Sequence, residues 1–248
     1  MMKYIRSFIC ALFFGGFGLG GLILGTIIFP IICFIYSGNR QRKVMINTIH
    51  YSWRFFVKIA FAFRLFSVNY DNIRNLLNTS GSIIICNHPS LIDIVILISL
   101  FRNTICIVKG ELANNFFIKH IVNSVFLVNS ENVSRIMAKS EELLNSGYNI
   151  VIFPEGTRTN EKSYFKLHRI FAQISLRTNR TILMLKIRQS FPILGKDQKW
   201  YQIGDRMCNY FILFGGYINP EDYQGKHVRT GAKDMVDRFQ KVLFAVDF

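Results

Sequence analysis

The stretch Ser-Ile-Ile-Ile-Cys-Asn-His-Pro-Ser-Leu-Ile-Asp at residues 82–93 decides the fold, because a buried strand and a buried helix meet within it. Its first five residues are a short β-branched run typical of an internal strand, and residues 91–100 are apolar enough for a buried helix. His88 therefore lies at a strand-to-helix junction, where unpaired N–H groups of the first helical turn face a crevice at the sheet edge.

His88 and Asp93 lie five residues apart, so a turn followed by the start of a helix can fold the carboxylate back onto the imidazole. A carboxylate in that place fixes the tautomer of the ring and supports the imidazolium formed in general-base catalysis. The alternative is structural: His88 would be a turn residue, and Asp93 an acid favoured at a helix start by the helix dipole.

A second strand, predicted at residues 149–153, also ends in polar residues: Glu155, Gly156, Thr157 and Arg158. Gly156 permits close approach of the backbone, Thr157 supplies a hydroxyl, and Arg158 supplies a planar set of donors suited to a phosphate. Glu155 is interpreted either as a helix-start acid or as the partner that orients Arg158. Taken alone, such a turn is more often solvated than functional.

With both clusters in place, the chain resembles the glycerolipid (lysophospholipid) acyltransferases, which include the 1-acylglycerol-3-phosphate acyltransferases. The family's first signature, Asn-His-x-x-x-x-Asp, is complete at residues 87–93, and its third, Phe-Pro-Glu-Gly-Thr-Arg, is complete at 153–158. The resemblance covers residues 81–218. Three segments, at 87–93, 107–109 and 199–202, resemble most closely the acyltransferases encoded beside aryl-polyene or dialkylresorcinol synthesis.

Three departures from the family pattern concern the acceptor. The second signature normally holds a Gly and then an Arg thought to grip the acceptor's phosphate, and this chain has Asn123 and Asn129 there. Ile170 and Phe171 stand where the family commonly has Gly-Ala, and Met184 stands where a Pro is usual. None of these changes touches the His–Asp pair, so they indicate an altered acceptor rather than lost chemistry.

The resemblance implies a membrane-bound O-acyltransferase of phospholipid biosynthesis. It would move a fatty acyl group from an acyl carrier protein or coenzyme A thioester to the hydroxyl of a lysophospholipid. His88 and Asp93 would be the catalytic dyad, residues 155–158 would place a phosphate, and neither a metal nor a cofactor is expected. Two alternatives stay open: the same chemistry on a non-glycerolipid acceptor such as an aryl-polyene lipid, and a non-catalytic lipid-binding scaffold in the membrane.

The composition points to an anionic partner. The 248-residue chain carries a net charge of +15, although half of its residues are hydrophobic. Nucleic acid, a membrane surface and an acidic carrier protein would all fit this charge, but no nucleic-acid-binding motif occurs. The five cysteines include no Cys-x-x-Cys pair, which predicts buried thiols in a reducing compartment without a disulfide framework or zinc site. The other four histidines lack a neighbouring acid motif, and no function is predicted for them.

The N-terminal region predicts a retained membrane anchor. Residues 8–36 contain no charged side chain, and the length of this run exceeds the roughly 20 residues needed to span a bilayer. A cleaved signal peptide is disfavoured because the apolar run continues into basic residues at 40–43. Gly-x-x-x-Gly spacing within residues 16–25 allows close helix approach, including a homo-oligomer, and equally a bend into a shallow hairpin. The larger basic cluster follows the run, which predicts a catalytic part on the cytoplasmic face of the cell membrane.

The sequence therefore divides into a membrane anchor at residues 1–37, a basic amphipathic interfacial helix with a linker at 38–80, and a catalytic domain at 81–248. The helix is expected over residues 45–66, and a buried packing helix is the open alternative to the membrane interface. Strands alternate with helices in the last part, which predicts an α/β fold with a mostly parallel central sheet flanked by helices. The strands are expected at residues 82–86, 104–108, 125–128, 149–153, 182–187 and 210–214.

Overall fold

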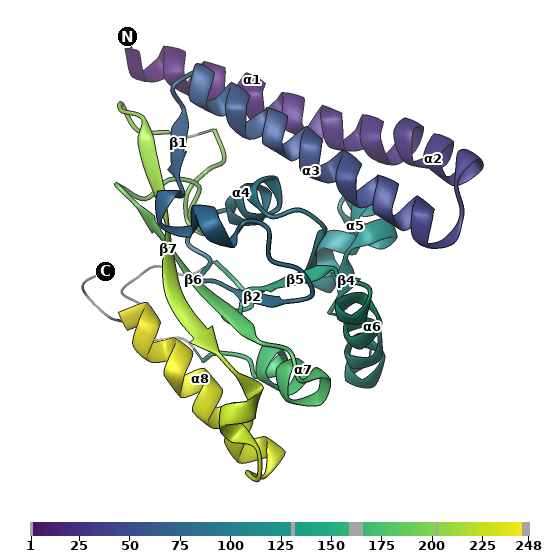
Figure 1. Ribbon diagram of the computed structural model, residues 1–248. Helices are drawn as coiled ribbons and strands as arrows, with labels where there is room; N and C mark the ends of the chain where they lie inside the picture. Colours follow the sequence, from purple (N-terminus) through teal and green to yellow (C-terminus); the bar gives the residue numbers. More distant parts are fainter. Residues whose placement is uncertain (1, 130–131, 159–165, 202, 245–248) are drawn as a thin grey trace.

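The computed structural model describes residues 2–129, 132–158, 166–201 and 203–244. Within these residues the strands form a seven-stranded sheet in the order β1-β7-β6-β2-β5-β3-β4 (Figure 1). Every neighbouring pair is parallel except β6 and β7, which are antiparallel. The predicted mostly parallel α/β sheet is thus confirmed. The strands are β1 (Phe66–Asn69), β2 (Ile83–Ile85), β3 (Thr104–Val108), β4 (Leu127–Val128), β5 (Asn149–Ile152), β6 (Ile182–Gln189) and β7 (Cys208–Ile218).

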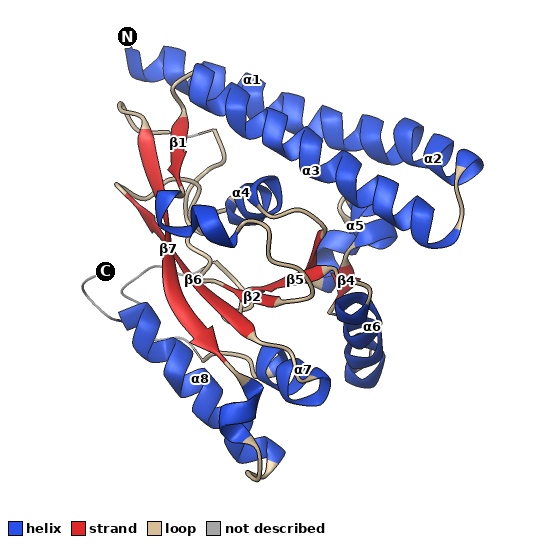
Figure 2. Cartoon of the chain, in the orientation of Figure 1, coloured by secondary structure: helices blue, strands red, loops and turns tan. Residues whose placement is uncertain are grey.

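The strand β2 lies inside the sheet between β5 and β6. All three of its isoleucines are fully buried, because both faces of a largely parallel sheet are covered by helices. One face is covered by α3 (Gly38–Ala62) and α4 (Asp93–Leu100), and the other by α6 (Val133–Asn145), α7 (Ile170–Thr178) and α8 (Val228–Phe244), as Figure 2 shows. The remaining helix of this part, α5 (Lys119–Val125), lies beside α3 and β4. Short 3₁₀ helices occur at η2 (Asp71–Leu76), η3 (Gly110–Asn114) and η4 (Pro220–Tyr223).

The N-terminal helices form an antiparallel pair along one side of the molecule (Figure 1). The first arm is α1 (Met2–Ile23), which continues through the π-helical turn η1 (Leu24–Ile28) into α2 (Phe29–Ile35). Its residues 5–35 form one helix that is long and apolar enough to cross a membrane, by length and composition. The chain stays helical through Pro30, which follows directly after the π-helical turn η1. The reversal follows α2, and α3 returns along α1 with Phe13 and Phe56 stacked at a centroid distance of 4.0 Å.

Close approach at the glycines of α1 and η1 occurs within the chain. A Cβ added at Gly25 would lie 2.6 Å from the Cβ of His120, and one added at Gly21 would lie 3.2 Å from the Phe117 carbonyl oxygen. Gly16 and Gly20 instead face open space. One glycine pair therefore seats α5 and the turn before it against the first helix, and a homo-oligomer through this segment stays a prediction.

The region between the helical pair and the sheet differs from its expected form. The helix predicted at residues 45–66 is α3, which begins earlier and ends at Ala62. Arg64 then adopts a left-handed conformation with φ of 54°, which ends the helix and directs Phe66 into β1. This unpredicted edge strand pairs with β7. The sheet thus draws one strand from the segment interpreted as an interfacial helix and linker, and the three-part division of the chain stays a prediction.

Candidate active site

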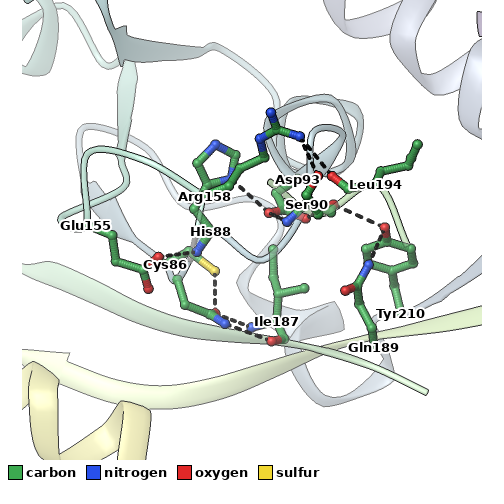
Figure 3. Close-up of polar contacts among 12 residues, drawn as sticks. Cys86, His88, Ser90, Asp93, Glu155, Arg158, Ile187, Gln189, Leu194 and Tyr210 are labelled. Atoms are coloured by element: carbon green, nitrogen blue, oxygen red, sulfur yellow. Dashed lines mark hydrogen bonds and ion pairs between the residues drawn. The ribbon is translucent and has the colours of Figure 1, made fainter. Parts of the chain in front are cut away.

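The two polar clusters meet at one edge of the sheet (Figure 3). They follow β2 and β5, which are parallel neighbours with Ile85 opposite Ile152. The carboxyl ends of parallel strands meet at the same edge. The structure therefore brings together the residues that the sequence places about sixty positions apart.

His88 and Asp93 are in direct contact. The Nδ1 atom of His88 lies 2.8 Å from Oδ2 of Asp93, whose side chain is fully buried. The imidazole also stacks on the Phe153 ring at a centroid distance of 4.3 Å and an interplanar angle of 20°. With Nδ1 facing the carboxylate and one face of the ring against Phe153, Nε2 is the nitrogen left to exchange a proton with a bound molecule.

The Asp93 carboxylate accepts two further hydrogen bonds, both from Ser90. The Ser90 backbone N–H donates to Oδ2 at 2.7 Å, and the Ser90 hydroxyl donates to Oδ1 at 2.5 Å. Three donors on a buried carboxylate compensate for the loss of water around the charge. Asp93 is therefore more than a helix-start acid, since its side chain organises the whole turn before α4.

Cys86 precedes the cluster and is fully buried. Burial raises the pKa of the Cys86 thiol well above its usual value, and the charges of Asp93 and Glu155 raise it further. The thiol is accordingly kept protonated, and the nucleophilic thiolate form is suppressed. Cys10, Cys106 and Cys208 are buried as well, as the sequence predicts, but the prediction is wrong for Cys33, which is exposed on α2.

Glu155 and Arg158 connect the second cluster to its surroundings. Glu155 is buried, and its Oε2 accepts a hydrogen bond from the backbone N–H of His88 at 3.2 Å. The NH1 group of Arg158 donates to the carbonyl oxygens of Leu194 and Gly195, at 3.1 and 2.9 Å. Glu155 thus supports the histidine-bearing turn, and a loop after β6 holds the guanidinium.

Leu194 occupies a strained position in that loop. Its φ of 57° lies in the left-handed region, which is unfavourable for a residue with a branched side chain. Its carbonyl oxygen accepts from Leu91 N at 3.0 Å as well as from Arg158. One backbone oxygen therefore ties the turn before α4 to the arginine.

A cavity of about 360 Å³ opens in front of these groups. Among its described lining residues, Lys109, Arg158 and Lys196 are cationic and Glu111 is acidic. Apolar atoms provide much of the remaining wall. The full lining comprises His88, Leu91, Ile94, Cys106, Ile107, Val108, Lys109, Glu111, Leu112, Asn129, Ile152, Phe153, Gly156, Thr157, Arg158, His168, Ile170 and Lys196.

Gly156 shows why this position favours glycine. Its φ is 65°, and an added Cβ would lie 2.9 Å from Nε2 of His168. The left-handed turn and the packed imidazole leave no room for a side chain. Gly156 and Thr157 thereby line the cavity with backbone and a short side chain, and their part in substrate binding stays a prediction.

Two of the three departures from the family pattern lie at the cavity. Asn129 and Ile170 line it, whereas Phe171 is buried with its ring 6.2 Å from that of Phe239. Met184 is buried in β6, opposite Gly216 of β7. The substitutions at 129 and 170 are therefore placed to alter what the cavity accepts.

Sequence reasoning missed several residues of the site: Gln189, Leu194, Gly195, Lys196, Tyr210 and His168. These residues come from later segments that only the folded sheet brings next to residues 87–93. Ser90 lies inside the first signature, but its role depends on a hydroxyl direction that spacing does not reveal.

In the described part of the chain, no group of three or more His, Cys, Asp or Glu side chains is placed to hold a metal ion. The expectation that no cofactor takes part stays a prediction.

The family model for acyltransferases matches residues 67–188, a range that contains both polar clusters. This segment belongs to the acyltransferase family. A 1-acyl-sn-glycerol-3-phosphate acyltransferase from Helicobacter pylori (strain J99) is 31% identical over 102 residues. That match covers 39% of this chain and 43% of the relative, so it spans less than half of either protein.

The fold that contains this acyltransferase-family segment also has a solved counterpart. The crystal structure of the 1-acyl-sn-glycerophosphate acyltransferase PlsC from Thermotoga maritima superposes with a TM-score of 0.69 over the full length of both chains, at 19% identity. The predicted family and the predicted α/β fold are confirmed. The closer resemblance to aryl-polyene acyltransferases stays a prediction.

Proposed function

We propose that this protein is a membrane-attached acyltransferase of phospholipid biosynthesis. It transfers a fatty acyl group from a thioester donor to the hydroxyl of a lysophospholipid of the 1-acylglycerol-3-phosphate type. The observation that carries the proposal is the contact of His88 Nδ1 with the buried Asp93 at the mouth of a basic cavity. The activity named for the H. pylori relative supports the choice of acceptor.

The proposed reaction uses His88 as a general base. Its Nε2 removes the proton of the acceptor hydroxyl while Asp93 stabilises the imidazolium. The oxygen attacks the thioester carbonyl, the carbon–sulfur bond breaks, and the thiolate leaves with the proton returned by His88. No side-chain nucleophile is consumed, which fits the high pKa of Cys86. The thioester is already activated, so positioning supplies much of the catalysis.

The phosphate of the acceptor would bind near Gly156, Thr157 and Arg158. NH1 of Arg158 contacts the loop carbonyls, and the remaining guanidinium N–H groups are the donors proposed for a phosphate. Lys109 and Lys196 line the same cavity and add positive charge. The basic surroundings also suit the phosphate groups of a coenzyme A or acyl carrier protein donor.

Membrane attachment would occur through the first helix, with the catalytic part on the cytoplasmic face. The support is the apolar helix at residues 5–35, followed by basic residues at 40–43. A hydrophobic helix beside the sheet would hold the cavity close to the lipid layer in which a lysophospholipid resides.

A second candidate keeps the same chemistry but takes a non-glycerolipid acceptor. The specific observation in its favour is that Asn129 and Ile170 line the cavity where the family commonly has Arg and Gly. An uncharged amide and a bulky aliphatic group favour an acceptor with less anionic charge than lysophosphatidic acid.

The deciding experiment is acyl transfer by purified, detergent-solubilised protein. Labelled acyl-carrier-protein and acyl-coenzyme A donors are each offered lysophosphatidic acid, other lysophospholipids and a hydroxylated polyene lipid. His88→Ala is expected to reduce turnover by about two to four orders of magnitude, whereas His227→Ala, at an exposed histidine, keeps it. Transfer only to the polyene lipid would support the second candidate. Equal turnover in the two variants, or no transfer by folded wild-type protein, would reject the catalytic proposal.

A further inference from the structure

A line of buried hydrogen bonds reaches the Asp93 carboxylate from the side opposite to His88 (Figure 3). It begins at Gln189, the last residue of β6. The Nε2 group of Gln189 donates to the Tyr210 hydroxyl at 2.6 Å. The Tyr210 hydroxyl donates to the Ser90 hydroxyl at 3.1 Å, and Ser90 donates to Oδ1 of Asp93. Tyr210, Ser90 and Asp93 are each fully buried.

The direction of each bond follows from the number of protons available. An ionised Asp93 has no proton, so the Ser90 hydroxyl must use its single proton toward the carboxylate. Ser90 can then only accept from Tyr210, and the Tyr210 oxygen accepts from the amide of Gln189. All three donors point toward the carboxylate, and each polarises the next.

Tyr210 is kept protonated for this role. Burial raises the pKa of its hydroxyl well above the usual value, and the charge of Asp93 raises it further. The hydroxyl therefore remains a donor across the range in which a histidine titrates. Packing alone does not explain the hydroxyl of Tyr210, because a phenylalanine at this position would make the same ring contact with Phe66.

We propose that Tyr210, acting through Ser90, is a positioning residue of the active site. It fixes the Ser90 hydroxyl on Oδ1 of Asp93, and this leaves Oδ2 directed at Nδ1 of His88. The β6–β7 pair thereby sets the orientation of the dyad. The kinetic consequences rest on the proposed acyltransferase function, whereas the effect on the dyad itself does not.

The first test compares Tyr210→Phe with Tyr148→Phe, which removes a hydroxyl from another buried tyrosine far along the chain from the dyad. Loss of one hydrogen bond to the network is expected to lower kcat about three- to tenfold with KM unchanged. Tyr148→Phe is expected to keep the wild-type kcat. Equal kcat values for the two variants would overturn the proposal.

A double variant separates positioning from general destabilisation. Ser90→Ala is expected to lower kcat about ten- to a hundredfold, since it removes a bond to a charged group. Ser90→Ala combined with Tyr210→Phe should be no slower than Ser90→Ala alone, because Tyr210 acts only through that hydroxyl. Effects that multiply would show that Tyr210 acts by another route. If Tyr210→Phe does not fold, Gln189→Met replaces it, with the same direction of effect and the same criterion.

The pH profile gives a readout that simple packing would not move. Removing a donor makes the carboxylate less stable as an anion, so the His88–Asp93 pair takes up a proton more readily. The acidic limb of kcat/KM is therefore expected at higher pH in Tyr210→Phe. The other charged groups at this edge, Glu155 on the His88 backbone and Arg158 on the loop after β6, are unchanged by the substitution.

The same shift can be measured without turnover. Ring-¹⁵N spectra of His88, identified by their loss in His88→Gln, are recorded against pH in the solubilised protein. A higher titration midpoint in Tyr210→Phe than in the wild type supports the positioning role even if no acyl transfer is found, in which case only the proposed function fails. An unchanged midpoint together with normal transfer would reject the positioning role and leave the proposed function intact.

Discussion

At the scale of single residues, the side chains of the cavity wall are where the proposed acceptor would be recognised. Asn129 lines the cavity with Lys109, Arg158 and Lys196, and its backbone N–H is fixed by the Val108 carbonyl at 2.7 Å. Its side chain can therefore be changed without altering the local backbone. Asn123, the other asparagine of that segment, instead donates its side-chain amide to the Ala113 carbonyl at 3.1 Å.

We predict that Asn129→Arg improves the use of lysophosphatidic acid. A guanidinium at the cavity would add a charge-assisted hydrogen bond to the phosphate, which corresponds to about a tenfold gain in kcat/KM. Asn123→Arg is the matched control and should give no gain. The measurement is kcat/KM for lysophosphatidic acid, and equal values for both variants would remove position 129 from the acceptor site.

The residue scale also shows how far spacing predicts a site. His88 and Asp93 could be paired from the sequence because five residues of turn and helix start bring them together. Gly156 and Arg158 could be singled out because glycine and arginine have few equivalents in the phosphate-binding role proposed for this turn. Tyr210 could not be predicted, since it lies 120 residues from Ser90 and only the antiparallel pairing of β6 and β7 directs it there.

At the scale of elements, glycine contacts seat α5 against the first helix. Gly25 lies against His120, whereas Gly20 of the same helix faces open space. Both positions are helical, so alanine gains about 0.5–1 kcal/mol of helix stability at either one. The contacts around the new methyl group therefore decide the sign of the change.

We predict that Gly25→Ala destabilises the protein and Gly20→Ala does not. The methyl group at position 25 would meet the His120 Cβ at 2.6 Å and push α5 away, at a cost of about 1–3 kcal/mol. Thermal unfolding in detergent measures the difference. A midpoint for Gly25→Ala equal to that of Gly20→Ala would contradict the packing described here.

The contact between α3 and α4 contains a buried histidine. The Nδ1 atom of His50 lies 2.7 Å from the Ile98 carbonyl oxygen. Burial lowers the pKa of His50, and the Arg54 and Arg102 charges lower it further, while the hydrogen bond to Ile98 opposes them. The folded protein therefore holds His50 neutral at a pH where the unfolded chain already takes up a proton.

Because the pKa of His50 is lower in the folded protein than in the unfolded chain, the free energy of unfolding should fall as the pH drops below about 6.5. We predict that the unfolding midpoint decreases by several degrees between pH 7 and pH 5.5, and that His50→Phe removes most of this dependence. His227→Phe, at an exposed histidine, should retain it. If the His50 variant is as pH-sensitive as the wild type, another group is responsible.

At this scale, the types of most strands and helices could be predicted from the sequence, whereas β1, the strand that follows α3, could not. β2, β3 and β5 are buried apolar runs, and α4 is a longer continuous apolar stretch, so composition and length identified them. β1 was missed because Phe66 and Val68 continue the apolar pattern of α3 and no Pro or Gly marks the change. The turn between α3 and β1 depends on Arg64 adopting a left-handed conformation, which is set by tertiary structure and is not visible in the local sequence.

At the scale of the whole molecule, exposed apolar side chains gather on the first helix, away from the sheet. Phe34 is the extreme case, with 93% of its surface exposed. The others on α1, η1 and α2 are Ile5, Phe8, Leu12, Leu19, Ile23, Ile27, Ile31 and Ile35. Such a surface on a chain of charge +15 suits insertion into an anionic lipid layer.

We predict that the protein co-sediments with vesicles containing anionic lipid, and that 1 M salt weakens but does not abolish this binding. Salt screens the charges, whereas burial of apolar surface persists. Phe34→Asp should reduce binding at high salt. Val228→Asp, at an exposed apolar residue of α8 across the sheet, should not. Binding lost entirely in 1 M salt would contradict apolar insertion.

The first helix also touches the loop that holds the arginine. Arg6 donates to the carbonyl oxygens of Gly204, Arg206 and Arg64, at 3.1, 3.0 and 3.0 Å, and Cys10 lies 3.5 Å from that of Trp200. The same loop, between β6 and β7, contains Leu194 and Gly195, whose carbonyls hold Arg158. Deleting the helix to obtain a soluble protein would release this loop at one end. Kinetic constants and inhibitor affinities measured on such a truncation would then describe a differently shaped binding site, so screening campaigns need the full-length protein in detergent or lipid.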